Sequence, residues 1–409
     1  MLNRLWIGFF LLAFVCSLYQ YAVVGNALIF EQMMTALFAM AKLTVEIAIG
    51  LIGLLAFWLG MMAIAERAGL IAFIARGLAP LFERLMPDVP KGHPAIGSMM
   101  MNLAANFLGL DNAATPLGLK AMHDLQALNP NKDTATNAQI LFLVLNTSSI
   151  TLFPVTIFMY RAQQGAATPT DVFIPILLAT FASTMAGLLA VAWVQKIALW
   201  QRWILLYVGG LLTLVLGLVG YFLTLTAEAL AAQSSLMANF LLLFTLCLFV
   251  AVAAYRKVDV YEQFISGAKQ GFEISIQLIP YLLAMLCALG LFRASGALDL
   301  LMEAVRVLVN FAGVDARFVD ALPTALMKPF SGSGARAMMI ETMASFGADS
   351  FVGRLVSIVQ GSTETTFYVL AVYFGAVGIK YTRHAVACAL VADVAGITAA
   401  IAVCYWFFG

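Results

Sequence analysis

The chain has 409 residues, of which 63% are hydrophobic and only 11% are charged. Soluble domains are about 45–50% apolar and about 25% charged, so this composition excludes an ordinary soluble protein. A formal net charge of +1 supplies no basic surface for nucleic acid, and we expect no nucleic-acid partner.

The polar residues do not indicate catalytic or cofactor chemistry. The three histidines lack a second ligand at helical spacing and the five cysteines lie within apolar runs, which predicts no metal site. We see no nucleophile–base set, so we expect no enzyme activity and no cofactor. The sequence has no Walker-type phosphate-binding loop, so ATP is not the expected direct energy source.

Nine apolar stretches approach the length of about 20 residues that a membrane span requires. The first follows Arg4 and is longer than the apolar region of a signal peptide, so we expect it to be a retained span. In chain order the predicted spans are 5–25, 46–64, 138–161, 171–195, 202–224, 234–255, 273–294, 350–378 and 383–408.

Six further segments are apolar but too short or too interrupted to cross a membrane simply. Four of them look amphipathic and are expected to lie at the membrane interface, namely 29–45, 68–86, 258–272 and 297–314. The other two, 94–128 and 318–346, have polar centres and are treated below.

The distribution of basic residues predicts the orientation of the chain. Arg4 precedes the first span, and most other lysines and arginines of the loops fall on the same side once the nine spans are counted. The exceptions are Arg161, Arg293, Arg306 and Arg317. This bias predicts a cytoplasmic N-terminus and, after nine crossings, a C-terminus outside.

The two halves of the chain resemble each other in three ordered, gapless matches. The matches pair 46–69 with 273–296, 146–153 with 360–367, and 186–187 with 395–396. Each half contains four spans, and the span at 202–224 belongs to neither. Because that extra crossing turns the second unit upside down, the sequence predicts inverted repeats, which in membranes are chiefly a feature of transporters.

This repeat defines the expected fold and domains. We predict an all-α polytopic membrane protein with inverted structural repeats, two re-entrant helical hairpins and two broken transmembrane helices, similar to an elevator transporter. The expected units are 1–200, a linking helix at 201–227, and 228–409.

Four polar interruptions carry the functional prediction. A hairpin with a polar tip precedes the third span of each half, and that span is itself broken by polar residues. Backbone that is not helical at membrane depth is tolerated only where it is buried in protein or lines a cavity. We therefore expect the interruptions to converge near the midplane and to bind a small polar solute. The candidate residues are Asn106, Asp111, Asn112, Thr115, Asn146, Thr147, Ser148, Ser149, Ser331, Gly332, Ser333, Arg336, Gln360, Ser362, Thr363, Glu364 and Thr365.

The alternative for these polar residues is a purely structural role. Hydroxyl and amide groups in spans commonly bond back to their own helix or join neighbouring helices. Charged groups at such depth are costly and are usually functional or paired. Glu364 and Asp393 are therefore candidates for coupling transport to H⁺ or Na⁺, and Arg336 either holds an anionic group of the solute or neutralises Glu364.

Several of these motifs resemble known families. Residues 1–200 are similar to bacterial spore maturation protein A in 57–60, 106–118 and 146–148, and the remainder is similar to spore maturation protein B in 295–299, 360–378 and 392–394. Both belong to the nucleoside recognition, or gate-domain, group, which is similar to the core of concentrative nucleoside transporters. The resemblance implies a natural fusion with an elevator-like transporter core in a bacterial inner membrane.

The sequence therefore predicts a secondary-active transporter in contact with membrane lipid. A passive channel or gate, and a structural protein of sporulation or of the envelope, remain alternatives. Nucleoside-like, amino-acid-like and organic-acid solutes are all compatible with the candidate residues. Small residues on the linking span, Gly209, Gly210, Gly217 and Gly220, are compatible with a homo-oligomer such as a dimer.

Overall fold

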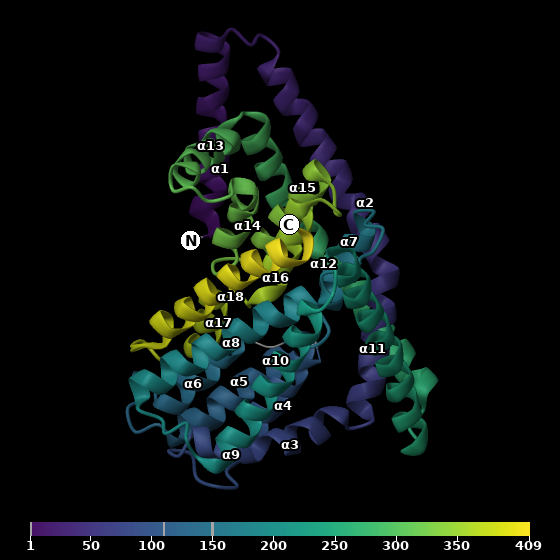
Figure 1. The fold of residues 1–409 in the computed structure, drawn as a ribbon, viewed down its shortest axis with the longest axis vertical. Coiled ribbons are helices and arrows are strands. Elements are labelled where there is room, and N and C mark those ends of the chain that lie inside the picture. Colours follow the sequence, from purple (N-terminus) through teal and green to yellow (C-terminus); the bar gives the residue numbers. More distant parts are fainter. Residues whose placement is uncertain (1, 109–110, 149–150) are drawn as a thin grey trace.

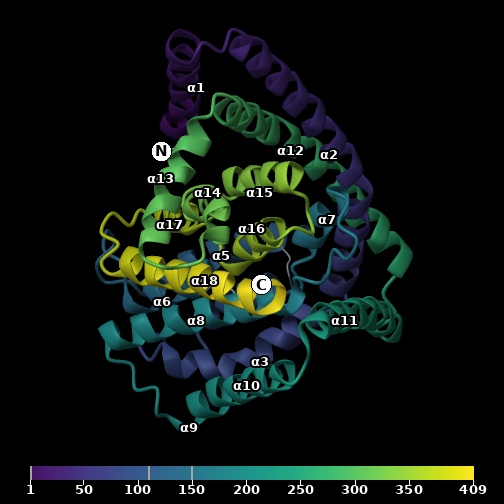
Figure 2. The same ribbon diagram turned by 45° about the horizontal axis from the view of Figure 1, so that its top comes forward.

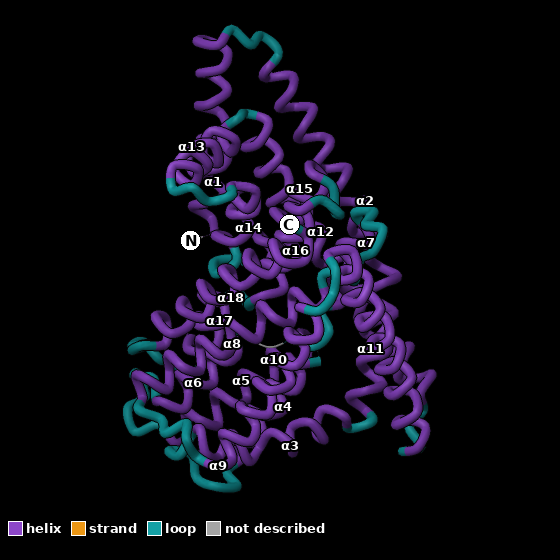
Figure 3. The backbone as a smooth tube through the Cα atoms, in the orientation of Figure 1, coloured by secondary structure: helices purple, strands orange, loops and turns teal. Residues whose placement is uncertain are grey.

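The computed structural model describes residues 2–108, 111–148 and 151–409, without the side chains of residues 2–5, 111–113 and 227–228. The described part consists of helices and loops, and it contains no strand beyond one isolated bridge (Figure 3). Seven of its helices are long and apolar enough to cross a membrane. The predicted all-α polytopic fold is confirmed.

Eight α-helices lie in the described residues of the first half. They are α1 (Leu2–Tyr19, extended by a π-helical turn to Val24), α2 (Ile29–Arg67), α3 (Leu70–Leu85), α4 (Pro94–Phe107), α5 (Asp111–Leu128), α6 (Asn137–Thr147), α7 (Val155–Gln163) and α8 (Phe173–Gln195). A linking segment follows, made of α9 (Arg202–Ile204), a π-helical turn (Leu205–Gly209) and α10 (Gly210–Leu223).

The second half repeats this order. It contains α11 (Ala227–Tyr255), α12 (Val260–Ala294), α13 (Ala297–Phe311), a 3-10 helix (Ala316–Ala321), α14 (Leu322–Met327), α15 (Gly332–Phe346), α16 (Phe351–Ser362), α17 (Thr366–Ala376) and α18 (Ala385–Phe408). Gly69 and Gly296, which the repeat aligns, take φ values of 73° and 72° at the corresponding α2–α3 and α12–α13 corners. The same left-handed turn, which glycine adopts without steric cost, therefore ends the long helix of each half.

For two of the four segments predicted to lie at the membrane interface, the prediction is wrong. Residues 29–45 and 258–272 are not separate surface helices, because they are the first parts of α2 and α12. Neither segment contains a proline, and Lys42 pairs with Glu46 on an exposed face at 3.6 Å, so the charges do not interrupt the helix. At about 1.5 Å per residue, the 39 residues of α2 extend about 58 Å, well beyond a hydrocarbon core of about 30 Å.

The predicted helix breaks are confirmed. The third predicted span of the first half is divided into α6 and α7, and its counterpart is divided into α16 and α17. The helices stop at Thr147 and Ser362, inside the polar stretches of the sequence. The two polar-centred segments form α4–α5 and α14–α15, which we call hairpin 1 and hairpin 2.

Equivalent helices of the two halves pack against each other in antiparallel pairs. A Cβ atom on Gly267 of α12 would lie 2.4 Å from the carbonyl oxygen of Leu59 in α2, so only glycine permits this crossing. Ser183 of α8 donates a hydrogen bond to the carbonyl of Ala392 in α18 at 2.9 Å, and these two helices lie side by side in both views (Figures 1 and 2). Antiparallel packing of equivalent elements is the arrangement that inverted repeats require.

The helices form two groups, which we call the core unit and the frame. The core unit comprises α4–α8 and α14–α18, in which α16 packs on α8 and, equivalently, α6 packs on α18. The frame comprises α1–α3 and α9–α13 and is centred on the α2–α12 pair. The core unit meets the frame where α3 packs on α4, α12 on α15, α11 on α18 and α8, and α2 on α7.

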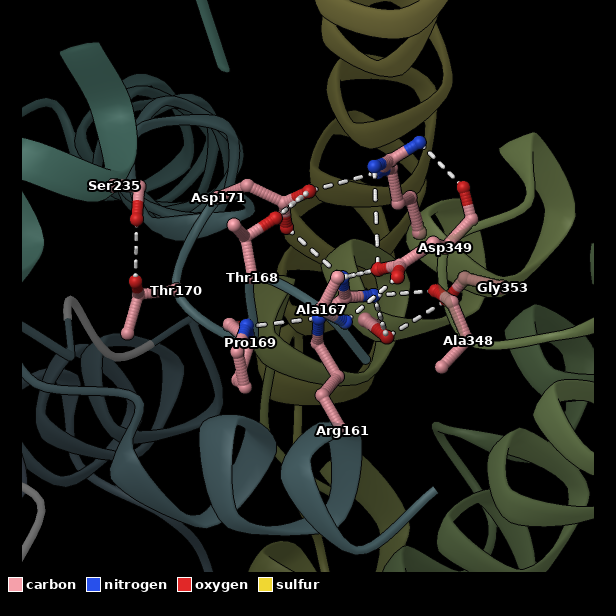
Figure 4. Close-up of polar contacts among 12 residues, drawn as sticks. Arg161, Ala167, Thr168, Pro169, Thr170, Asp171, Ser235, Ala348, Asp349 and Gly353 are labelled. Atoms are coloured by element: carbon pink, nitrogen blue, oxygen red, sulfur yellow. Dashed lines mark hydrogen bonds and ion pairs between the residues drawn. The ribbon is translucent and has the colours of Figure 1, made fainter. Parts of the chain in front are cut away.

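One end of the core unit is held by buried charges, which we call the ionic clasp (Arg161, Asp171, Asp349 and Arg354). The fully buried side chain of Arg161 pairs with Asp171 at 2.9 Å and with Asp349 at 3.2 Å. Arg354 also pairs with Asp171, at 2.8 Å. Figure 4 shows how the clasp joins the α7–α8 loop of the first half to the α15–α16 loop of the second.

Backbone groups hold the equivalent loops together elsewhere in the core unit, forming what we call the backbone clasp (residues 133–135 and 380–381). The amide of Lys380 donates to the carbonyl of Asp133 at 2.8 Å, and the amide of Ala135 donates to the carbonyl of Tyr381 at 3.0 Å. These residues connect the α5–α6 loop of the first half with the α17–α18 loop of the second. The two halves of the core unit are thus joined at both equivalent positions.

The four arginines that break the charge bias of the loops are all neutralised. Each pairs with carboxylates, namely Arg161 with Asp171 and Asp349, Arg293 with Glu341, Arg306 with Glu303 and Asp320, and Arg317 with Asp315. A hydrogen bond from the backbone amide of Arg317 lowers the pKa of Asp315 below its ordinary value. The described basic residues of the opposite loops form no such ion pair, so unpaired positive charge is concentrated on the side predicted to be cytoplasmic.

Candidate functional site

The four polar interruptions are joined by hydrogen bonds. In hairpin 1, Asn106 donates to the side chain of Asn146 at 2.8 Å, and the carbonyl of Phe107 accepts from the amide of Leu152 at 2.9 Å. In hairpin 2, the carbonyl of Pro329 accepts from the amide of Phe367 at 2.9 Å. Each hairpin tip is therefore bonded to the broken helix of its own half.

The two breaks also contact each other directly. The amide of Glu364 donates to the carbonyl of Thr147 at 2.8 Å. The orphaned carbonyl at the end of α6 is thus satisfied by the unwound segment after α16. Both hairpin tips and both broken helices consequently belong to one connected polar centre in the core unit.

The breaks are supported by equivalent glycines. A Cβ atom on Gly187 of α8 would lie 3.0 Å from Val144 Cγ1, and one on Gly396 of α18 would lie 2.8 Å from Thr363 Cγ2. The repeat aligns these two glycines. Their close approach brings α8 and α18 against the breaks and leaves no space for a larger residue.

A polar side chain also braces each break from the same pair of helices. Thr184 of α8 donates to the carbonyl of Ser148 in the first break. At the equivalent position in α18, Asp393 accepts a hydrogen bond from Thr366 at 2.7 Å, while its other carboxylate oxygen is buried without a partner. The two halves share this bracing position, but only the second half places an ionisable group there.

A polar cavity of about 70 Å³ lies beside the second break. It is lined by the end of α16 and the following break, by the segment that opens α7, by hairpin 2, and by Trp58 of the frame; its polar lining is formed by Trp58, Thr151, Thr156, Lys328, Arg336, Gln360, Thr363 and Glu364. Three of the lining side chains, Trp58, Gln360 and Thr363, each carry a buried polar atom without a hydrogen-bond partner, namely Nε1, Oε1 and Oγ1. Buried polar groups are normally paired, so these three atoms are an unusual concentration of unpaired polar groups among the described residues around one cavity.

An apolar cavity of about 230 Å³ adjoins the polar one. The two cavities share Trp58, Thr156 and Arg336 as lining residues. The remainder of its wall consists of Leu51, Leu55, Leu59, Met159, Tyr160, Ile274 and Leu278. Because these residues come from α2 and α12 on one side and α7 on the other, the cavity lies between the frame and the core unit.

Three charged residues line the polar cavity. Lys328 is 4% exposed at the tip of hairpin 2, and it interacts electrostatically with Asp393. The guanidinium of Arg336 lies 5.6 Å from the ring centre of Tyr160, a distance at which a cation is attracted to an aromatic face. Glu364 is half-buried in the unwound segment after α16 and also lines the cavity, so the cavity presents both positive and negative groups.

The structure separates the predicted site residues into groups. Arg336, Gln360, Thr363 and Glu364 line the polar cavity. Thr147, Ser148 and Ser362 donate to carbonyls of their own helices, as the structural alternative predicts. Ser149 lies outside the described residues, as do the side chains of Asp111 and Asn112.

The remaining candidates have local roles or lie apart from the cavities. Ser331 caps α15 by accepting from the amide of Gly334 at 3.0 Å, and its hydroxyl lies 3.3 Å from that of Ser333. Gly332 permits the close approach of Thr365, whose Oγ1 would lie 2.6 Å from an added Cβ. Asn106, Asn146 and Thr115 do not appear among the described residues that line either cavity.

Two cavity residues were not among the sequence-based candidates. Lys328 immediately precedes the polar tip of hairpin 2, and its charge within an apolar chain was a usable signal. Trp58 lies in the middle of an apolar span, where an aromatic residue normally indicates packing or lipid contact. Only its unpartnered Nε1 atom, which depends on the fold, distinguishes it.

Comparisons with known proteins agree with the internal repeat. The sequence model of the family described as nucleoside recognition, or Gate, matches residues 48–163 and again 275–380. These two matches run from within α2 to the end of α7 and from within α12 to just beyond α17. The family unit therefore contains the hairpin and the broken helix of each half.

Two relatives from Bacillus subtilis (strain 168) are similar to different shares of the chain. Spore maturation protein A is 40% identical over 189 residues, which cover 46% of this chain and 93% of the relative. Spore maturation protein B is 46% identical over 154 residues, which cover 38% of this chain and 85% of the relative. No solved structure matches this chain.

Proposed function

Because this chain belongs to the nucleoside recognition family and carries two units of it, homologous to spore maturation proteins A and B, we propose that it is a secondary-active, elevator-type membrane transporter. The proposed cargo is a small solute that binds in the polar cavity beside the second break. The protein would use no ATP, and an ion gradient would drive accumulation of the solute.

The observation that carries this proposal is the position of the cavity. Its polar lining comes from two breaks and one hairpin of the core unit, whereas Trp58 of the frame closes it. Three of its lining residues, Trp58, Gln360 and Thr363, each carry a buried polar atom that has no hydrogen-bond partner among the described residues. A solute site between two bodies is what alternating access requires, since motion of one body against the other exchanges the exposed side.

The two clasps support motion of the core unit as a single body. Leaving Arg161 buried without Asp171 costs about 3–5 kcal/mol, so the halves of the core unit resist separation. Movement is therefore expected along the surface between the core unit and the α2–α12 pair. A passive channel would need no such division into bodies, and a structural protein would need no polar cavity.

Two carboxylates are proposed to couple the solute to an ion. Glu364 lines the cavity, and Asp393 is 1% exposed with one unpartnered oxygen. Protonation at either residue would neutralise a charge at membrane depth, where charge is expensive. Na⁺ bound by unwound carbonyls is the rival coupling ion.

We further propose that the protein resides in a bacterial inner membrane with a cytoplasmic N-terminus and the C-terminus outside. The concentration of unpaired basic residues on one side supports this orientation. A cysteine introduced at Trp200, which is 87% exposed, would be labelled by an impermeant maleimide only after the cytoplasmic face is opened.

Uptake into proteoliposomes tests the function. Protein-containing and empty vesicles would be compared across nucleosides, amino acids and organic acids, with a proton or a sodium gradient imposed. Accumulation that collapses with the gradient and is lost in Trp58→Ala is expected. Equal movement in both directions without a gradient would instead favour a passive gate.

A further inference from the structure

We infer that the solute is an amino-acid-like zwitterion with a bulky apolar side chain, an inference that rests on the proposed function for its transport but not for its binding. The two adjoining cavities differ in size and chemistry. Together they have the shape of a small charged head attached to a larger apolar body.

The polar cavity sets the size of the head. A volume of about 70 Å³ corresponds to about two water molecules at about 30 Å³ each. This space accommodates a carboxylate and an ammonium group on one carbon atom. It is too small for a sugar ring with its hydroxyl groups, which argues against a nucleoside in this arrangement.

The wall of the polar cavity carries groups for both charges of a zwitterion. Arg336, Lys328 and Trp58, whose side chains carry donors, line it, and Arg336 suits a carboxylate because its guanidinium donates in a planar fork. Glu364 and Gln360, whose side chains carry acceptors, also line it and suit an ammonium group. The wall therefore combines positive and negative side chains, as a zwitterion requires.

The apolar cavity indicates the size and chemistry of the side chain of the solute. Its volume of about 230 Å³ and its lining of leucine, isoleucine, methionine and aromatic residues match an aromatic or branched side chain. The two cavities together approach the lower limit of about 300 Å³ for small-molecule sites. Glycine or alanine would fill only the head position and leave the apolar cavity empty.

Binding of radiolabelled phenylalanine to the purified full-length protein tests this inference. We expect saturable binding that is competed by leucine and tryptophan. Phenylacetate and phenylethylamine, which each lack one charge, should compete at least about tenfold less well, and uridine should not compete. Competition by uridine at concentrations similar to leucine, or no binding of phenylalanine, would overturn the inference.

Two variants separate the head from the body. Arg336→Gln should weaken phenylalanine binding at least about tenfold, because the carboxylate of the solute loses its charged partner in a desolvated site. Arg336→Lys, which keeps the positive charge, should recover part of this binding. Leu278→Trp, which fills the apolar cavity lined by Leu278, should abolish phenylalanine binding and leave the binding of radiolabelled alanine unchanged. Binding of phenylalanine without uptake would refute transport but support this solute class. Uptake of uridine would support transport but refute this solute class.

A second inference rests on a different observation, a pair of charges that the repeat inverts. In the second half, Arg293 at the end of α12 donates to Glu341 of α15 at 2.9 Å. This ion pair joins the frame to the core unit. Three residues after Arg293 stands Gly296, and Glu341 is the tenth residue of α15.

The first half carries opposite charges at the equivalent positions. Glu66 stands three residues before Gly69 in α2, and Lys120 is the tenth residue of α5. Both side chains are exposed, and within the described structure they form no ion pair. Likewise α12 packs on α15, whereas α2 and α5 make no comparable contact among the described residues.

We propose that these pairs are alternative latches between the core unit and the frame. Inverted repeats exchange their conformations when access alternates, so the state opposite to this one joins Glu66 to Lys120 and separates Arg293 from Glu341. The complementary charge is retained in both halves although its sign is reversed, which fits a contact that each half forms in turn.

Spin labels at Thr35 and Ala344, which are exposed on the frame and on α15 and belong to neither latch, test this proposal by pulsed distance measurement. Lys120→Glu should shift the populations about twofold to fivefold toward the present state, the range for an exposed ion pair. Adding Glu66→Lys should restore them. Because Glu66 and Lys120 are both exposed, the substitutions should leave folding intact. No shift with Lys120→Glu, or no restoration by the double variant, would overturn the proposal.

Discussion

The ionic clasp and the backbone clasp occupy equivalent places in the two halves, but they use different chemistry. The ionic clasp depends on four side chains, of which Arg161 and Asp171 are almost completely buried. The backbone clasp depends on main-chain groups of residues 133–135 and 380–381. The comparison teaches that an internal repeat preserves where two segments must meet, while leaving open the groups that hold them together.

The largest expected effect comes from breaking the ionic clasp. Asp171→Leu should lower the free energy of unfolding by about 3–5 kcal/mol, because it leaves the guanidinium of Arg161 buried without its closest partner. Denaturant titration of the purified protein in detergent measures the loss. Arg161→Met combined with Asp171→Leu should be substantially more stable than Asp171→Leu alone, and equal instability of both would contradict this account of the clasp.

The glycines that support the breaks extend the comparison to the centre of the core unit. Gly396→Ala and Gly187→Ala should each lower the free energy of unfolding by about 1–3 kcal/mol, the usual cost of overpacking. Gly396→Ala should be the worse of the two, since its Cβ would lie 2.8 Å from Thr363, compared with 3.0 Å from Val144 for Gly187→Ala. Gly217→Ala, which meets no neighbour within 4 Å, is the matched control.

Side-chain changes in the backbone clasp should have small effects. Tyr381→Ala should change the free energy of unfolding by no more than about 0.5 kcal/mol, because an exposed side chain is removed and the main-chain hydrogen bonds remain. The same titration measures it beside Asp171→Leu. A loss as large as that of Asp171→Leu would show that the clasps do not differ in the way described.

The smallest effect is expected when the backbone clasp is locked covalently. Thr134→Cys with Tyr381→Cys, in a protein whose five native cysteines are replaced, places the pair at a β-bridge. If the core unit moves as one body, solute uptake by the disulfide-linked protein should stay within about twofold of uptake by the reduced protein. A loss of uptake that dithiothreitol reverses would mean that the halves separate during transport.

The sequence predicted the features that depend on local chemistry. Polar residues such as Asn146 and Gln360 interrupt apolar spans, and both helices end beside them. The long helices α2 and α12 were divided wrongly, because the predicted spans begin at the charged residues Glu46 and Glu273, whereas both helices continue through these positions. The antiparallel pairing of equivalent helices followed from counting spans.

The chemistry of the site was less accessible to sequence reasoning. Polar residues within a break look alike, yet Ser362 bonds to its own helix while the neighbouring Thr363 retains an unpartnered hydroxyl. Trp58 reaches the cavity from a helix about 300 residues away from the second break in the chain. Such contacts depend on tertiary packing and have no local signal.

Pulsed distance measurements between two pairs of spin labels test the two-body account most directly. One pair, at Thr35 and Ala344, joins the frame to the core unit, and the other, at His123 and Val391, joins the two halves within the core unit. The account predicts two distance populations for the first pair and one for the second. Two populations within the core unit, or a single population for both pairs, would contradict it.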